Sequence, residues 1–327
     1  MKIHRPSHHQ SGLTLLELLV VLTILVALST VAITSTGGVA DQARYEATQR
    51  TLENIRDAVI GPANLRDTDG TLLYTGFVAD MGRLPQAAAD GSNFTLAELW
   101  QNVNGIEPYL VRQASGANVD VPTEGDTDVY VATGWRGPYL RLSPGHAGLL
   151  DGWGHSFQLR TSVPADVTAS GEAVASVHSF GANGSENVLD DGYDLDVGVS
   201  FDDETAASLD VTVQILQANG SPAPPPANGS PASIIVRLYG PNPSNGLIRV
   251  LSASEDFEEN AVPPLATNYE QVSFPGLTPG PYVLRAYYDG NHNGYAAAET
   301  ATDRASLIHE LHVHPRGNKK SVNLIVP

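Results

Sequence analysis

The sequence predicts an α+β protein in which a long N-terminal transmembrane helix packs on a small antiparallel sheet and is followed by an all-β sandwich. Three observations indicate this: an apolar run at Leu13–Ile33, apolar residues at helical spacing after it, and strand-like alternation from about residue 209. Because 327 residues suit two domains, we divide the chain into residues 1–12 (leader), 13–61 (helix), 62–208 (head with an acidic loop) and 209–327 (sandwich).

The N-terminal apolar run is long enough to cross a bilayer. Its only charged residue is Glu17, and at ~1.5 Å per residue it covers roughly 31 Å, close to the ~30 Å hydrocarbon core. Lys2 and Arg5 favour a cytoplasmic N-terminus, so the rest of the chain is expected outside the cytoplasm. The alternative is a secretory signal peptide, but its apolar region usually has ~7–15 residues and Ser29–Ala32 is a poor cleavage site.

Glu17 is the most informative residue of this run. A carboxylate in hydrocarbon costs on the order of 3 kcal/mol unless it is paired, so it indicates a functional site; an incidental acid that snorkels to the interface is the alternative. The segment Ser11-Gly12-Leu13-Thr14-Leu15-Leu16-Glu17 resembles the processing site of type IV pilins and type II secretion pseudopilins. The resemblance implies that prepilin peptidase cuts after Gly12 and methylates Leu13, where the family more often has Phe. It also implies that Glu17 pairs with the N-terminal amine of a neighbouring subunit and sets the register of a filament.

Three later segments extend the resemblance. Gly134–Leu140, Asp151–Phe157 and Ser179–Gly184 resemble, in this order, segments of the major pseudopilin of type II secretion. The likeness covers about residues 11–200 and implies the pilin fold, a single pass through the inner membrane and periplasmic globular domains, with assembly into a periplasmic or surface filament. The implied partners are prepilin peptidase, other pseudopilins or pilins, and the inner-membrane assembly platform.

The residues after the apolar run predict how the helix continues and where it ends. Thr48, Leu52, Ile55 and Val59 recur at helical spacing, and Gly61-Pro62 ends the helix. The pair Gly37-Gly38 predicts an interruption or kink, since each glycine costs ~1 kcal/mol in a helix interior.

Short elements are expected in the head that follows the helix. The sequence predicts strands at Thr71–Val78 and Val129–Thr133 and a helix-like piece at Leu96–Val103. Aromatic side chains are expected to form the core under the loops, namely Trp135, Tyr139, Trp153 and Phe157.

An acidic run after the head segments predicts a cation site. The stretch from Asn183 to Asp210, both ends included, contains nine acids, and no Lys or Arg lies between Arg160 and Arg237. Oxygen-rich loops bind Ca²⁺, although a solvated acidic loop is the alternative. The resemblance adds that the major pseudopilin carries calcium in this loop. It implies ligands at Asn183, Asp190, Asp191 and Asp194, with Ser185, Glu186 and Asp196 as secondary candidates.

Alternation in the last third predicts seven strands and hence a sandwich. They are Leu209–Gln217, Ser233–Tyr239, Leu247–Ser252, Tyr269–Phe274, Pro281–Tyr288, Ser306–His314 and Lys320–Val326. Phe274–Arg285 resembles the turn and strand of carboxypeptidase-regulatory and transthyretin-like sandwiches. Asp289–Gly294 matches half of an EF-hand loop but is better explained as a turn, and His309, His312 and His314 fit an exposed strand face better than a metal site.

The composition excludes several classes of function. Acidic residues outnumber basic ones 36 to 18, and the net charge of −18 argues against nucleic-acid binding. The absence of cysteine rules out disulfides and thiol catalysis, and no GxSxG elbow, phosphate loop or complete GxGxxG is present. We expect a structural pseudopilin-like subunit and not an enzyme. A surface adhesin that displays the sandwich on a pilin stalk, or a secreted hydrolase with a binding domain, remains as the alternative.

Overall fold

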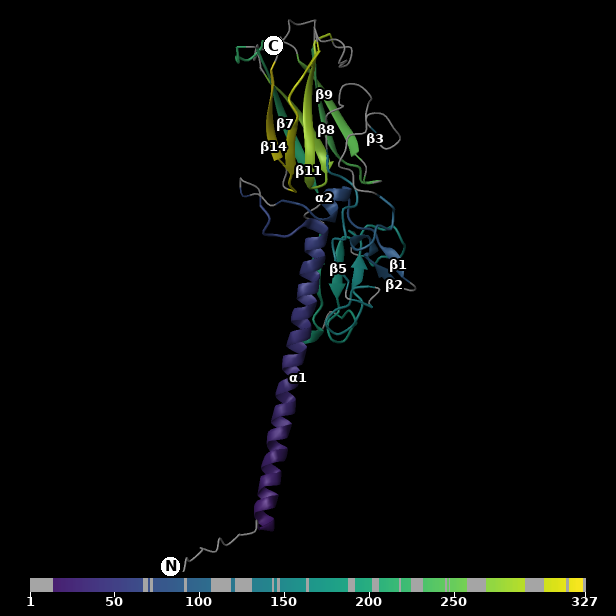
Figure 1. Ribbon diagram of the computed structural model, residues 1–327, viewed down its shortest axis with the longest axis vertical. Coiled ribbons are helices and arrows are strands. Elements are labelled where there is room, and N and C mark those ends of the chain that lie inside the picture. Colours follow the sequence, from purple (N-terminus) through teal and green to yellow (C-terminus); the bar gives the residue numbers. More distant parts are fainter. Residues whose placement is uncertain are drawn as a thin grey trace, which may run out of the picture.

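The protein consists of a long helix, a head beside the C-terminal half of that helix, and a β-rich part beyond it (Figure 1). The predicted α+β class is confirmed. The computed structural model describes all residues except 1–13, 67–69, 71–72, 91–92, 107–118, 121–130, 143, 146–147, 163–164, 188–191, 202–205, 218, 225–231, 245, 247, 258–268, 292–302, 316–317 and 326–327.

The helix α1 (Leu15–Ile60) has 46 residues and is about 69 Å long at ~1.5 Å per residue. Its backbone continues through Gly37 and Gly38, so the predicted interruption there is wrong. The helix ends where Gly61, at φ 109°, donates its N–H to the carbonyl oxygen of Asp57.

One stripe of α1 joins the core of the head. Thr48, Leu52, Ile55 and Val59 are each at most 6% exposed, as their spacing predicts. The head approaches the stripe closely at Gly152, whose N–H donates to the Thr48 Oγ1 at 2.9 Å. A Cβ at Gly152 would lie 2.0 Å from the Arg44 carbonyl oxygen, so only glycine fits there.

The sequence predicts a membrane crossing at residues 13–33. Among the residues whose side chains the structure describes, no helix is long and apolar enough to cross a membrane.

The head contains small sheets and short helical turns. The antiparallel sheet β4-β5-β6 packs beside α1, and the hairpin β1–β2 lies farther from the helix, with β2 in contact with β4 (Figure 1). The elements are α2 (Phe77–Met81), β1 (Ala88–Asp90), β2 (Asn93–Thr95), the 3-10 turn η1 (Ala97–Leu99), β4 (Gln158–Arg160), β5 (Ser176–Ser179), the 3-10 turn η2 (Gly192–Asp194) and β6 (Val197–Ser200).

Three local predictions in the head are wrong. The predicted strand at 71–78 is irregular at 73–76 and then becomes the buried helix α2. Two glycines explain this: a Cβ at Gly76 would lie 2.7 Å from the Val59 carbonyl oxygen, and Gly82 ends α2 in the left-handed conformation. Of the strand predicted at Val129–Thr133, residues 131–133 form no regular strand, and residues 129–130 lie outside the described part of the chain. The predicted helix at 96–103 is only η1 followed by turns.

The predicted aromatic core is mostly present. Phe157 is buried. The Tyr139 ring packs edge-on against the rings of Phe77 and Trp135, with distances of 5.6 and 6.0 Å between ring centroids. Trp153 is half-buried and is not part of this apolar cluster.

Two sheets around one apolar core form the β-rich part, residues 207–325. One has the order β10-β7-β14, and the other has the order β12-β11-β8-β9-β3 with β13 also on β11. The strands are β7 (Ala207–Leu216), β8 (Ala232–Pro241), β9 (Ile248–Phe257), β10 (Tyr269–Leu277), β11 (Gly280–Asp289), β12 (Asp303–Ala305), β13 (His309–Val313) and β14 (Asn318–Ile325). The alternating pattern of β7 buries every second residue, as predicted.

A segment of the head contributes to the second sheet. The two-residue strand β3 (Val119–Asp120) pairs in parallel with Ile248 and Arg249 of β9. Nearby, Val131 is 3% exposed and packs with Tyr239, Ile248 and Val283. Part of the head sequence therefore belongs structurally to the β-rich part.

The β-rich part also rests directly on α2. A Cβ at Gly82 would lie 2.9 Å from the Pro241 carbonyl oxygen, and a Cβ at Gly280 would lie 2.9 Å from the Ala79 Cα. The His312 Nε2 donates to the carbonyl oxygen of Tyr74 at 2.9 Å. Backbones thus meet closely along this boundary.

Candidate functional site

The N-terminus of α1 is closed by a capping box. The Glu17 N–H donates to the Thr14 Oγ1 at 3.3 Å, and the Thr14 N–H and hydroxyl both donate to the Glu17 Oε2 at 3.1 Å. Helical side chains tilt toward the N-terminus, which explains why Glu17 reaches back over Thr14. The carboxylate therefore lies at the first residues of the helix, where negative charge is favoured by the helix dipole.

The segment after Glu17 exposes apolar side chains on every side of the helix. Eleven large apolar residues between 15 and 28 are 46–83% exposed: Leu15, Leu16, Leu18, Leu19, Val20, Val21, Leu22, Ile24, Leu25, Val26 and Leu28. At roughly 1.5–3 kcal/mol for each buried side chain, covering them is worth on the order of 15–30 kcal/mol. An apolar surface of this size needs a lipid or protein environment.

The predicted cleavage site itself, Gly12 and Leu13, lies outside the described residues. The description begins at Thr14, one residue after the predicted new N-terminus. The Glu17 carboxylate accepts the N–H of Thr14 at 3.1 Å.

The acidic loop folds back on itself and on α1. The Ala182 N–H donates to the Tyr193 carbonyl oxygen at 2.8 Å, which places the start of the loop beside η2. The Tyr193 hydroxyl donates to the Gln42 Oε1 at 3.0 Å. The loop therefore lies at the end of the head that faces the exposed apolar segment of α1 (Figure 1).

The predicted calcium ligands have different roles among the described residues. The Asn183 Oδ1 accepts the Ser185 N–H at 2.8 Å, and the Glu186 carboxylate binds the Arg160 guanidinium at 2.7 Å. Asp194 belongs to η2, and Asp196 follows it. Asp190 and Asp191 lie outside the described part of the chain, within which no group of three or more His, Cys, Asp or Glu side chains is placed to hold a metal. The calcium site stays a prediction.

Sequence reasoning missed two buried acids in the head. Glu98, 3% exposed, accepts from both Arg83 Nη atoms at 2.7 and 2.8 Å and from the Gln86 N–H at 2.7 Å. Asp80, 2% exposed, binds the Arg136 guanidinium and the Tyr139 hydroxyl. Burial raises the pKa of the Asp80 carboxyl, while Arg136 acts in the opposite direction. Glu98 and its partner Arg83 are 15 residues apart in the sequence, and Asp80 and its partner Arg136 are 56 residues apart. Neither ion pair therefore gives a local signal in the sequence.

The C-terminal motifs have structural roles. The Asp289 Oδ1 accepts the Asn291 N–H, a turn contact that agrees with the expected turn, and residues 292–294 of the EF-hand-like motif lie outside the described chain. The prediction that the C-terminal histidines form an exposed strand face is wrong. His312 and His314 are half-buried and pack on the Tyr74 ring, with distances of 6.4 and 6.2 Å between ring centroids. The rings cover the segment that links α1 to α2.

Comparison with known proteins identifies the N-terminal segment. The family model of the prokaryotic N-terminal methylation motif matches residues 7–33, which include Gly12, Leu13 and Glu17. No curated protein and no solved structure matches the chain significantly. The motif is typical of structural pilin-type substrates of prepilin peptidase and not of enzymes. The chain therefore has a type IV pilin-like N-terminus.

Proposed function

We propose that the protein is a pilin-like structural subunit of a type II secretion or type IV pilus-like filament. In this proposal, prepilin peptidase removes residues 1–12 and methylates Leu13, and α1 then passes from the inner membrane into the filament through the assembly platform. The head and the β-rich part face the periplasm or the surface. The observation that carries the proposal is the methylation motif at residues 7–33, which includes the exposed apolar part of α1 at residues 15–28.

The membrane stage of the proposal is supported by the sequence of the apolar segment. Its length suits a ~30 Å hydrocarbon core, and its single acid costs on the order of 3 kcal/mol there unless it is paired. A neighbouring subunit's amine supplies that pair during assembly.

Processing is tested with Gly12→Ala in cells that contain prepilin peptidase. We expect the uncut precursor to accumulate, which N-terminal sequencing and intact mass detect. The matched control is Gly38→Ala, because a Cβ at Gly38 meets nothing within 4 Å, and this variant should be processed normally. A wild-type protein that starts at Met1 or after Ala32 would contradict the proposal.

Assembly is tested with Glu17→Ala and Thr14→Ala, which separate two roles of the carboxylate. Both changes break the capping box, at a typical cost of ~1 kcal/mol, but only Glu17→Ala removes the charge that pairs with a neighbouring amine. We expect Glu17→Ala to remain in the membrane and to be absent from sheared filaments, and Thr14→Ala to be incorporated. Equal incorporation of the two variants would overturn the pairing role.

We propose further that the acidic loop binds Ca²⁺ through Asn183, Asp190, Asp191 and Asp194. The support is the acidic run in a stretch of sequence that has no Lys or Arg between Arg160 and Arg237, as calcium accepts about 6–8 oxygen ligands in flexible geometry. Calcium at a hundredfold excess over Kd should stabilise the full chain by ~2.7 kcal/mol relative to chelator. Asp190→Ala with Asp191→Ala should abolish the shift in melting temperature, whereas the exposed Glu53→Ala should preserve it. If the wild-type melting curve is the same in calcium and in chelator, the loop binds no calcium and is a solvated acidic loop.

A further inference from the structure

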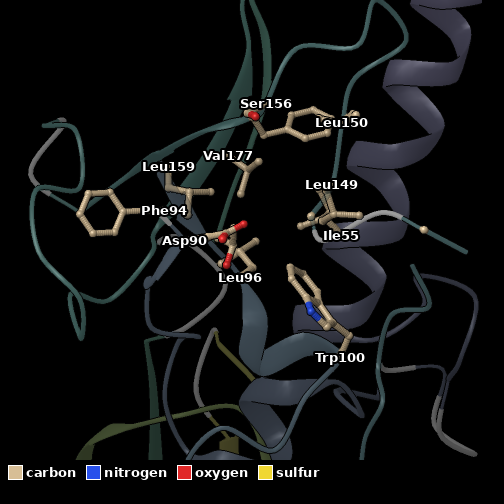
Figure 2. A pocket seen from close by; sticks show the side chains of 14 residues that line it. Ile55, Asp90, Phe94, Leu96, Trp100, Leu149, Leu150, Ser156, Leu159 and Val177 are labelled. Carbon is tan, nitrogen blue, oxygen red and sulfur yellow. The ribbon is translucent and has the colours of Figure 1, made fainter. Parts of the chain in front are cut away.

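A cavity of about 290 Å³ opens in the head between α1, β2, β4 and β5. Its floor is formed by Ile55, Leu159 and Val177, which are at most 5% exposed, and its rim includes the half-buried Trp100. Figure 2 shows these side chains pointing toward a common centre. Apolar walls of this kind offer water few hydrogen-bond partners, so the cavity favours an apolar occupant.

Asp90 gives the cavity a charge. It is exposed and is the only charged residue among the described residues that line the cavity, and its carboxylate lies among the apolar side chains in the view of Figure 2. The chemistry that fits is an apolar group with a cation beside it. The volume is at the lower end of the ~300–1,000 Å³ typical of ligand pockets, so a protein side chain fits better than a drug-sized molecule.

The chain itself presents such a group. Of the large apolar side chains that are exposed in the described residues, Leu65 alone is next in sequence to a Lys or Arg. Leu65 is 40% exposed, and Arg66 beside it is also exposed. The loop is held in place, because the Leu65 N–H donates to the Pro62 carbonyl oxygen and the Leu65 carbonyl oxygen accepts the Leu73 N–H.

The two surfaces lie on different sides of α1. The loop that follows α1 leaves the helix on one side, and the β1–β2 hairpin, which carries Asp90, lies on the other (Figure 1). A contact between different surfaces of two copies is heterologous, and when its rotation does not close into a ring it generates an open helical filament. This is the type of contact that the proposed function requires.

We propose that the cavity receives Leu65 of a second copy of this chain, with Arg66 of that copy facing Asp90. This inference rests on the proposed function, because it names a contact between subunits of the filament. The apolar side chain supplies the anchor, and the charged pair at the rim fixes its orientation.

The chain has no cysteine, so single introduced cysteines test this contact directly. A full-length chain with Leu65→Cys and a differently tagged chain with Leu150→Cys, at the cavity rim, are expressed together and oxidised. We expect disulfide-linked heterodimers, which are intermolecular because each chain has one cysteine. The matched control replaces Leu65→Cys by Leu195→Cys, whose wild-type side chain is 49% exposed, and should give no heterodimer.

A charge exchange tests the specificity of the pair. Arg66→Asp or Asp90→Arg alone should reduce the yield of the Leu65–Leu150 crosslink roughly fivefold, and the two changes together should restore it. Leu65→Ala should reduce the incorporation of an otherwise wild-type chain into sheared filaments by about tenfold.

The outcomes separate this inference from the proposed function. Wild-type filaments without the heterodimer, or charge variants that the exchange does not rescue, would overturn the Leu65 contact and leave the subunit function standing. Crosslinking of Leu150→Cys only to another protein would likewise overturn it and assign the cavity to that protein. If the processed wild-type chain forms no filaments and the pair of cysteine variants forms no heterodimer, both proposals fail.

Discussion

His178 of β5 has an environment that disfavours its charged form. Burial lowers the pKa of its imidazole, and the nearby Arg160 guanidinium lowers it further. The ring is confined, because the His178 Nε2 lies 3.0 Å from the Ser176 Oγ and a Cβ at Gly198 would lie 2.5 Å from the His178 Nδ1. Protonation must therefore introduce charge into a site with little room for added water.

Stability should depend on pH through this residue. Because the folded-state pKa is lowered, the neutral histidine contributes stability that is present above its unfolded value of ~6.5 and is lost as the pH falls below it. We expect the urea midpoint of the wild-type protein to fall between pH 7.5 and pH 5 by more than that of His178→Asn. Parallel pH profiles for the two proteins would show that His178 does not titrate in this way.

Elements far apart in the chain meet where α1 joins the head. The Thr48 hydroxyl accepts the Gly152 N–H and donates to the Arg44 carbonyl oxygen at 3.0 Å, so one buried side chain satisfies groups on two elements. The Gly152 backbone lies directly on the helix, and no side chain separates them. This contact fixes the distance between head and helix.

Removal of this contact should destabilise the head. Thr48→Val leaves the Gly152 N–H buried without its partner, at an expected cost of ~1–3 kcal/mol, and Gly152→Ala forces the two elements apart at a similar cost. Both are measured by urea unfolding of the full chain in detergent. The control is Thr51→Val, whose hydroxyl donates only within the helix to the Ala47 carbonyl oxygen and which should change stability by less than ~0.5 kcal/mol. If Thr48→Val and Thr51→Val lower the free energy of unfolding equally, the Thr48–Gly152 hydrogen bond does not stabilise the head.

Elements whose signal is local in the sequence could be predicted, and elements that depend on distant residues could not. The strand predicted at Leu209–Gln217 is observed at Ala207–Leu216, because alternation along ten residues is a local signal. The capping box and the methylation motif are also contiguous in sequence and were predictable for that reason. In contrast, α2 depends on backbone contacts of Gly76 and Gly82 with distant residues, and β3 is two residues long and needs β9. The cavity is lined by residues that are spread along the chain from Ile55 to Val177.

Across the whole molecule, the head and the β-rich part share structure and are not independent modules. Val131 is buried by Tyr239, Ile248 and Val283, and α2 lies under β8 and β11. Residues on both sides of the predicted boundary at residue 208 contribute to these contacts. Both parts are therefore expected to unfold in one transition.

A chain that ends at residue 208 should be less stable than the head within the intact protein. Its α2 and Val131 surfaces lose their cover, so we expect a lower melting temperature and increased binding of a hydrophobic dye. The measurement compares this truncated chain with the full chain in the same detergent, with α1 intact in both. A truncated chain that melts at the temperature of the full chain would contradict the shared core.

The strand that the head contributes to the second sheet also has a mechanical consequence. A load applied to the β-rich part, with α1 held at its base, reaches the helix through the chain that enters β7, through the contacts of α2 with β8 and β11, and through the β3–β9 pairing and the packing of Val131. Extending the first connection alone cannot separate the parts, since β3 must also be peeled from β9. The parallel pairing places those hydrogen bonds in a continuous sheet, so tension is distributed over β9, β8 and β11 before it reaches the rod-like helix.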